Sequence, residues 1–338
     1  MIPLKTKEYI AGKTRLSSIP KIMNLEVTNV CNLNCSICME KNVREQGFLD
    51  TGFLEKIIKE NAEELKGQSI WLHYGGEPLL HSQLSEIIKI LKSSGVRTRL
   101  STNATLLTKE KSFELMKAGL DYIVFSVDGN TKETYEKIRR GGIFEEVENN
   151  ILNFLKIKKD KNFKTETQIQ IVRIKINERE IKPFVRKWKK TDINYLNVKS
   201  FSTRAGKVAK IDKFGDFIEL EKKIFNRPPC FFLWETLIIL WNGDVLACCQ
   251  DLCGELKLGN LKENNLMEIW NNSKLIDLRK RQLNNDFSME PCNRCPDWKG
   301  YPRNYFHYFI DVLSRRFLKE FLKTEKKDEG IHIIFNRK

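Results

Sequence analysis

The chain has 338 residues, of which 41% are hydrophobic and 30% are charged. This composition is typical of a globular protein and excludes a largely disordered chain. The longest apolar run, residues 231–241, is interrupted by Glu235. It is too short and too polar to cross a bilayer, so no membrane span is expected.

The net charge of +15 is unevenly distributed along the chain. Residues 156–213 contain 18 basic and 6 acidic residues, which gives this stretch a net charge of +12. It fits an anionic substrate, or a basic surface that serves only solubility. A role on tRNA would suit the charge, but no recognisable nucleic-acid-binding module accompanies it, and we predict no DNA partner.

The nine cysteines are clustered in the sequence. Residues 1–21, which we treat as an N-terminal leader, mix charged and apolar residues and lack the apolar core of a signal peptide. We therefore expect a cytoplasmic protein whose thiols stay reduced. In that compartment, clustered cysteines indicate metal sites rather than disulfides.

From residue 22 onward, short β-type runs alternate with amphipathic helical patterns. The expected strands are residues 23–27, 70–74, 96–101, 122–127, 168–175 and 195–200. The expected helices are residues 53–65, with Asp50 or Thr51 as N-cap, and residues 84–91, 109–118, 144–157 and 181–189. Strands that alternate with helices pair in parallel, because parallel neighbours need crossover connections. We predict the α/β class, with a partial (β/α)6 TIM-like barrel over residues 22–205.

The pattern changes after residue 205. Asn242-Gly243 lies between the apolar runs 237–240 and 244–246, which is a strong hairpin signal, and a short helix is expected over residues 266–270. We predict a small α+β domain over residues 206–300. The remaining residues, 301–338, are predicted to form a helical tail whose aromatic side chains suit a docked apolar face.

Three cysteines follow the first expected strand with the spacing Cys-x3-Cys-x2-Cys: Cys31, Cys35 and Cys38. Three thiolates this close can meet at one metal centre. The neighbouring sequence offers no fourth ligand for a structural zinc ion, whereas three ligands leave one iron of a [4Fe–4S] cluster open. A zinc loop that borrows a distant ligand is the alternative.

The spacing resembles the signature of the radical S-adenosylmethionine (radical SAM) family, and further similar segments end successive expected strands. Gly75-Gly76-Glu77-Pro78 resembles the segment that binds the methionine amino group, and Ser126-Val127-Asp128 resembles the segment that reaches the ribose. The cofactor-binding residues that the resemblance implies are Gly75, Gly76, Glu77, Asn103, Ser126, Asp128 and Arg139, the last facing the methionine carboxylate. Ile37 stands where relatives often carry an aromatic residue against the adenine.

Four later cysteines form a second constellation: Cys230, Cys248, Cys292 and Cys295. They resemble the auxiliary-cluster extension of the same family, called SPASM, in its shortened "twitch" form. This resemblance implies a second, auxiliary [4Fe–4S] cluster with four thiolate ligands, suited to relaying electrons. A zinc knuckle with the same ligands is the alternative.

Two cysteines remain, Cys249 and Cys253. A thiol can donate a hydrogen atom to a carbon radical, as in radical SAM epimerases, so Cys249 is a candidate catalytic residue. The alternatives for Cys249 are a buried small hydrophobic residue and a swapped cluster ligand. Cys253 receives no role.

The resemblance implies the reaction class. A reducing partner such as flavodoxin or ferredoxin supplies an electron, S-adenosylmethionine is cleaved to a 5′-deoxyadenosyl radical, and the radical removes a hydrogen atom from the substrate. We expect an oxidoreductase that oxidises a small molecule by two electrons, with the auxiliary cluster as acceptor. The alternatives are a radical epimerase and an enzyme that matures a peptide substrate, although we see no room for an N-terminal peptide-recognition domain. A non-catalytic iron–sulfur or zinc protein is the hypothesis from another class.

Overall fold

The computed structural model describes residues 2–39, 42–202, 204–205, 207–208, 227–295 and 332–335. A single sheet runs through these residues in the order β10-β6-β5-β4-β3-β2-β1-β7-β8-β9. Its strands are β1 (Lys21–Leu25), β2 (Ser69–Trp71), β3 (Arg97–Thr102), β4 (Tyr122–Ser126), β5 (Glu166–Arg173), β6 (Tyr195–Ser200), β7 (Thr236–Ile239), β8 (Asp244–Leu246), β9 (Lys257–Asn260) and β10 (His332–Phe335).

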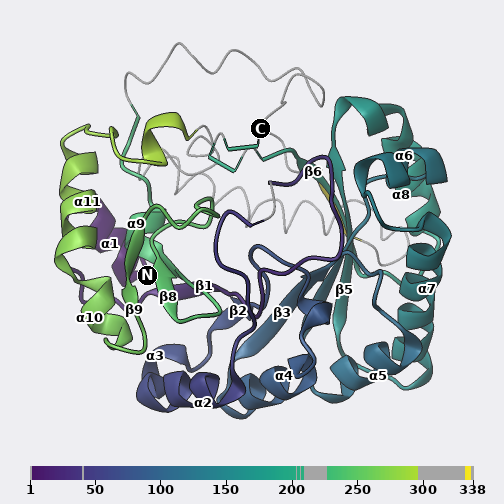
Figure 1. Ribbon diagram of the computed structural model, residues 1–338, viewed down its shortest axis with the longest axis horizontal. Coiled ribbons are helices and arrows are strands. Elements are labelled where there is room, and N and C mark those ends of the chain that lie inside the picture. Colours follow the sequence, from purple (N-terminus) through teal and green to yellow (C-terminus); the bar gives the residue numbers. More distant parts are fainter. Residues whose placement is uncertain are drawn as a thin grey trace.

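Strands β1 to β6 pair in parallel in chain order, and helices cover the outer side of the curved sheet (Figure 1). The predicted α/β class and partial (β/α)6 barrel are thus confirmed. The sheet extends beyond the six strands, because β7 pairs in parallel with β1 and β10 pairs in parallel with β6. Strands β7 and β8 form the antiparallel hairpin that the Asn-Gly signal predicted, and β9, which the sequence analysis did not predict, pairs antiparallel with β8.

The helices that connect the parallel strands are α2 (Thr51–Glu60), α3 (Ala62–Leu65), α4 (Leu84–Ser93), α5 (Lys109–Lys117), α6 (Lys132–Ile138), α7 (Phe144–Asp160) and α8 (Ile181–Trp188). Asp50 caps α2, accepting a hydrogen bond from the backbone N–H of Phe53. The one helix expected over residues 53–65 is divided at Asn61. The buried Asn61 amide donates to the Ile57 carbonyl and accepts from the backbone N–H of the distant Leu266, and these contacts accompany the break.

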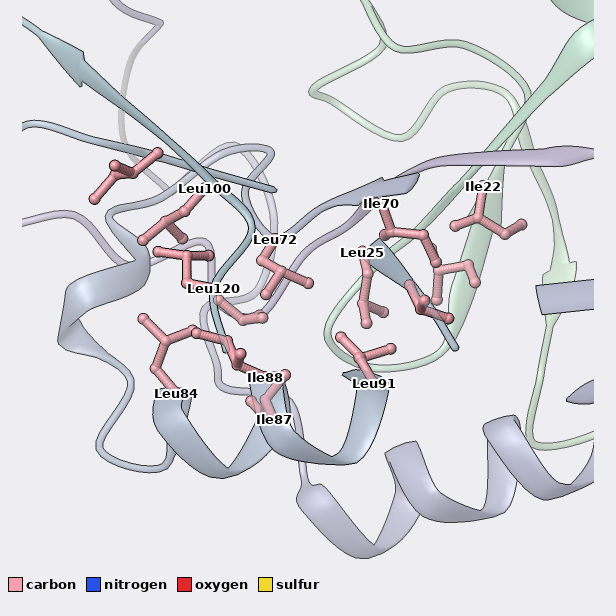
Figure 2. Packing of buried hydrophobic residues seen from close by; sticks show 14 of the residues in the cluster. Ile22, Leu25, Ile70, Leu72, Leu84, Ile87, Ile88, Leu91, Leu100 and Leu120 are labelled. Atoms are coloured by element: carbon pink, nitrogen blue, oxygen red, sulfur yellow. The ribbon is translucent and has the colours of Figure 1, made fainter. Parts of the chain in front are cut away.

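The barrel core lies between the sheet and its helices, and Figure 2 shows the part beneath α4. Leu84, Ile87, Ile88 and Leu91 form the buried face of this helix, at the i, i+3, i+4, i+7 spacing of an amphipathic helix. They pack in one cluster with apolar side chains of the neighbouring strands. Each buried aliphatic side chain contributes about 1.5–3 kcal/mol to the free energy of folding. This packing holds in place the strands whose ends carry the site.

The N-terminal segment packs against the region after the barrel. The sequence did not predict helix α1 (Leu4–Ile10) or helix α11 (Ser273–Leu283), although it did predict α10 (Leu266–Trp270); α9 (Phe232–Glu235) lies nearby. The indole N–H of Trp234 donates to the Lys13 carbonyl at 2.6 Å, and that of Trp270 donates to the Ser18 carbonyl at 2.8 Å. Residues before β1 are therefore built into the second half of the chain.

Residues 296–331 and 336–338 lie outside the described part of the chain, so the predicted helical tail is described only at residues 332–335. These residues form strand β10, in line with the β-type sequence His-Ile-Ile-Phe. Within the described ranges, no helix has the length and apolar character needed to cross a membrane.

Replacing Arg279 should test how firmly the N-terminal segment is held. This fully buried guanidinium donates to the carbonyls of Thr14, Leu233 and Trp270 at 2.8–3.1 Å. Arg279→Met leaves these acceptors without a donor, and we expect the free energy of unfolding to fall by about 3 kcal/mol. Arg281→Met on the same helix removes an exposed cation and should change it by less than about 0.5 kcal/mol. Chemical denaturation followed by circular dichroism measures both, and equal midpoints would contradict the assignment.

Candidate active site with two cysteine clusters

Cys31, Cys35 and Cys38 line one pocket at the carboxyl end of the parallel sheet, together with Gly75 and Leu252. The loop that carries the three thiols is held against the end of α6. The backbone N–H of Asn34 donates to the Arg140 carbonyl at 2.9 Å, and that of Ser36 donates to the Ile138 carbonyl at 2.8 Å. The sequence motif therefore forms a preorganised thiol site.

Arg139 and Asp128 lie beside the first cysteine site and pair with each other. The Arg139 guanidinium contacts one Asp128 carboxylate oxygen at 2.5 and 2.7 Å, and the other oxygen accepts from the backbone N–H of Val172 at 2.8 Å. Arg139 also lies 3.9 Å from Cys35 Sγ. Burial raises the pKa of Cys35 to about 11, while Arg139 acts in the opposite direction. Arg139 is thus placed to favour a thiolate at Cys35.

The Gly75-Gly76 pair brings the end of β2 against the cysteine loop. A Cβ at Gly76 would lie 2.5 Å from the Val30 carbonyl oxygen and 2.6 Å from that of Thr28. Only glycine permits this approach, and the backbone N–H of Glu77 then donates to the Val30 carbonyl at 2.8 Å.

The buried Glu77 carboxylate joins two strand ends. It accepts from the Thr102 hydroxyl and the Asn103 backbone N–H at 2.7 Å, and from the Leu79 N–H at 3.1 Å. Burial raises its pKa, and the hydrogen bonds to the charged form oppose that rise. The Asn103 amide donates to Asn32 Oδ1 at 3.0 Å, which ties the end of β3 to the cysteine loop.

Ser126 ends β4 and belongs to a polar row across three strands. Its hydroxyl lies 3.2 Å from that of Ser101 and accepts from the Gln170 amide at 2.8 Å.

Ile37, where an aromatic residue is common in relatives, packs with Ile138, Ile174 and Phe201. An apolar surface is therefore retained at that position.

The second set of cysteines is gathered around Cys230. Burial and the neighbouring thiols of Cys248, Cys292 and Cys295 raise the pKa of Cys230. The Cys230 thiolate is thus disfavoured by burial and by its neighbouring thiols. Coordination to a metal cation would stabilise the thiolate, so these cysteines are suited to be the ligands of a metal centre. Gln282 orders the site: its amide nitrogen lies 3.3 Å from Cys292 Sγ, and its oxygen accepts from the Cys230 N–H at 2.7 Å.

Among the residues that the structure describes, no three His, Cys, Asp or Glu side chains are arranged to hold one metal ion. In an iron–sulfur cubane each thiolate binds a different iron, so its ligands stand further apart than those of zinc. The described lining of the first pocket offers three thiols and no His, Asp or Glu side chain, which is a donor set suited to an iron–sulfur cluster with one open iron.

A cavity of about 400 Å³ lies inside the barrel beside both cysteine sites. Its lining includes Tyr74, which precedes Gly75 of the first pocket in the sequence, and Cys249, which follows Cys248. A hydrogen bond with Cys249, together with burial, raises the pKa of Cys248 well above its usual value. Cys253 lines neither pocket.

Three cations of the cavity wall were missed by the sequence analysis: Arg99, Lys199 and Arg204. A signal was available for Arg99, which lies two residues before Ser101 on β3 and therefore on the same face. Strand alternation likewise places Lys199 on the face of Asn197, and both line the cavity. Of the described residues in the basic stretch 156–213, Lys199 and Arg204 line the cavity, so most of the charge described there lies elsewhere.

The chain belongs to the radical SAM superfamily, whose family model matches residues 25–202. Residues 230–296 match the SPASM model, an iron–sulfur cluster-binding domain. Membership brings a cluster that binds S-adenosylmethionine, S-adenosylmethionine itself and auxiliary iron–sulfur ligation. The predicted family, fold and cofactors are confirmed.

Relatives in sequence differ in their reported activities. The chain is 35% identical to an AdoMet-dependent heme synthase from Methanosarcina barkeri over 38% of each chain. It is 33% identical to a tungsten-containing aldehyde ferredoxin oxidoreductase cofactor-modifying protein from Pyrococcus furiosus, over 32% of this chain and 31% of the relative. These matches span about a third of each relative. A PqqA peptide cyclase from Gluconobacter oxydans is 24% identical over 84% of this chain and 86% of its own length.

Solved structures share the fold. BtrN in complex with AdoMet and 2-DOIA has a TM-score of 0.55 and 18% identity, covering 83% of this chain and 94% of BtrN. Streptococcus suis SuiB bound to its precursor peptide SuiA has a TM-score of 0.64 and 17% identity, covering 80% of this chain and 69% of SuiB.

Gly76→Ala should selectively disturb the first cluster. The added methyl group collides with the Thr28 and Val30 carbonyls and displaces the cysteine loop. We expect anaerobically reconstituted protein to lose about four of roughly eight iron atoms. Gly52→Ala in α2, where the added Cβ would meet only the Asp50 carboxylate oxygen at 3.3 Å, should keep full iron content. Equal iron in both variants would show that the loop tolerates the displacement.

Proposed function

We propose that this radical SAM enzyme oxidises a small molecule by two electrons, with Cys31, Cys35 and Cys38 holding the first cluster and Cys230, Cys248, Cys292 and Cys295 holding the auxiliary cluster. The observation that carries the proposal is the cavity, whose wall continues into both cysteine sites through Tyr74-Gly75 and Cys248-Cys249. A substrate there lies within reach of hydrogen-atom abstraction on one side and electron transfer on the other.

Gly75, Gly76, Asn103 and Ser126 are assigned to S-adenosylmethionine binding. Gly75 lines the first thiol pocket, and a side chain there would meet the Glu26–Arg44 pair. Glu77, Asp128 and Arg139 surround the same site. The buried carboxylates of Glu77 and Asp128 accept hydrogen bonds from the protein. In addition to any contact with the cofactor, Glu77 fixes the strand ends and Asp128 fixes Arg139.

The chain's own contribution is positioning and exclusion of water. When bound, the first cluster supplies the electron that cleaves S-adenosylmethionine, and the auxiliary cluster accepts the second electron of substrate oxidation. The cavity wall must hold the substrate carbon toward the first pocket and receive the proton released on oxidation. We propose flavodoxin or ferredoxin as the reductant and the cytoplasm as the location, where thiols stay reduced.

A second candidate, radical epimerisation, is favoured by one observation: Cys249 lines the cavity. Its thiol is placed to return a hydrogen atom to a substrate radical, which would make the net reaction redox-neutral. Peptide maturation is a third candidate, in view of the peptide cyclase relative and the peptide complex of SuiB.

Removing each ligand set should separate the clusters. The triple variant Cys31→Ala/Cys35→Ala/Cys38→Ala should retain roughly four iron atoms and form no 5′-deoxyadenosine with S-adenosylmethionine and dithionite. Cys292→Ala/Cys295→Ala should lose the iron of the auxiliary cluster and keep that of the first. Iron and sulfide analysis with product chromatography measures both, and a zinc-only wild-type protein that forms no nucleoside would refute the proposal.

Cys249→Ala distinguishes oxidation from epimerisation once a substrate is in hand. Oxidation predicts turnover in the variant and no solvent deuterium at the product carbon. Epimerisation predicts deuterium incorporation by the wild type in D2O and loss of turnover in the variant. Cys253→Ala is the matched control, since this thiol lines neither pocket. Mass spectrometry of the product gives the answer.

A further inference from the structure

The cavity wall carries three cations and no acid among its described residues. Arg99 comes from β3, Lys199 from β6 and Arg204 from the segment after β6. None of the three forms an ion pair with an acidic side chain within the described part of the chain, although many surface lysines and arginines do. Glu166 and Asp128 act on Arg99 and Lys199 only from outside ion-pair distance, so the cations of this wall lack a paired acid among the described residues.

Burial makes this arrangement costly. The pKa of Lys199 is lowered by burial and by the neighbouring Arg204, while Asp128 acts in the opposite direction. Asp128, however, is already paired with Arg139. A half-buried ammonium beside a guanidinium, with no counter-charge of its own, is stabilised when an anion binds.

Local structure sets the positions of Arg99 and of the Arg204 backbone. The Arg99 guanidinium lies 3.9 Å from the ring centre of Trp71 and 4.6 Å from that of Tyr122, so it is clamped by cation–π contacts. Arg204 has a left-handed backbone, with φ of 52°, as does Ala205 with φ of 54°. Such conformations are strained for residues with a side chain and concentrate at functional sites.

The three positive charges all act on His73, which lines the same wall. Burial lowers the pKa of His73 to about 3, and Lys199, Arg204 and Arg99 contribute to the drop. His73 is therefore neutral at pH 7, and it adds no charge to the cluster. Around these cations the remaining cavity side chains include neutral amides, those of Asn24, Gln168, Gln170 and Asn197.

We infer that the cavity recognises a small molecule bearing an oxyanion, a carboxylate or a phosphate ester, bound by Lys199 and Arg204 with Arg99 as a second anchor. The inference rests on the proposed function, because it takes this cavity to be the substrate site. Two cations close together suit an oxyanion, since charge-assisted hydrogen bonds are stronger than neutral ones. The neutral amides then suit hydroxyl or amine groups of the same molecule.

Calorimetric titration of the reconstituted full-length protein with inorganic phosphate and with glutarate, at fixed ionic strength, tests the inference. We expect saturable binding of at least one of these probes, and glutaramide, the neutral counterpart of glutarate, should not bind detectably. Lys199→Gln and Arg204→Gln should each weaken the binding by about tenfold or more. Lys190→Gln removes an exposed cation of the same basic stretch and should leave the binding unchanged.

Two further measurements keep the outcome decisive. Lys199→Arg retains the charge and should retain binding, which separates loss of charge from misfolding. Formation of 5′-deoxyadenosine by the wild type reports the radical chemistry separately. If the nucleoside forms but neither anion binds saturably, or if Lys199→Gln and Lys190→Gln bind alike, the oxyanion site is refuted while the proposed function stands. If the anions bind as expected but no nucleoside forms, the proposed function fails instead.

Discussion

The site depends on one buried carboxylate, that of Glu77. It accepts hydrogen bonds from Thr102 and Asn103 at the end of β3, while its own backbone N–H donates to Val30 before the first cysteine. Three loops from different parts of the sequence are joined through this residue. Parallel strands bring their carboxyl ends to one edge, but packing alone does not set the loops that follow. The Glu77 contacts supply that order, and they need Gly76 because a side chain there would separate the backbones.

Arg44 extends this order to the second half of the chain. Its guanidinium forms a two-point contact with the buried Glu26 carboxylate at 2.7 and 3.1 Å, and it donates to the Leu252 carbonyl at 2.7 Å. Glu26 follows β1, whereas Leu252 lies four residues after Cys248, which we assign to the auxiliary cluster. A buried ion pair of this kind adds little net stability, but loss of one partner leaves a buried charge. Its value lies in fixing the cysteine loop relative to the auxiliary region.

The parallel strands were predictable from sequence because their apolar runs alternate with helical patterns of ordinary length. Helix α1 escaped prediction for a physical reason: it is stabilised by distant partners, such as the contacts of Tyr9 with Phe231 and Trp234, which no local pattern contains. The motif residues of the site could be named because their segments resemble those of the radical SAM family and most of them follow successive strands. Their partners could not, since the pairing of Asp128 with Arg139 depends on how α6 returns to the sheet. Of the cavity cations, Arg99 and Lys199 could be predicted only through strand alternation, once Ser101 and Asn197 had been placed facing inward.

Tyr74 shows how the two halves of the site are coupled. It is a buried residue whose hydroxyl donates to the Cys248 carbonyl at 3.1 Å, and the next residue, Gly75, lines the first thiol pocket. Burial and the nearby Cys248 raise its pKa, so the phenol stays protonated and remains a donor. The Arg44 guanidinium lies 5.9 Å from its ring centre. Tyr74 and Arg44 therefore hold the segment 248–252 at two points, Tyr74 through the Cys248 carbonyl and Arg44 through that of Leu252, and both residues adjoin the first thiol pocket.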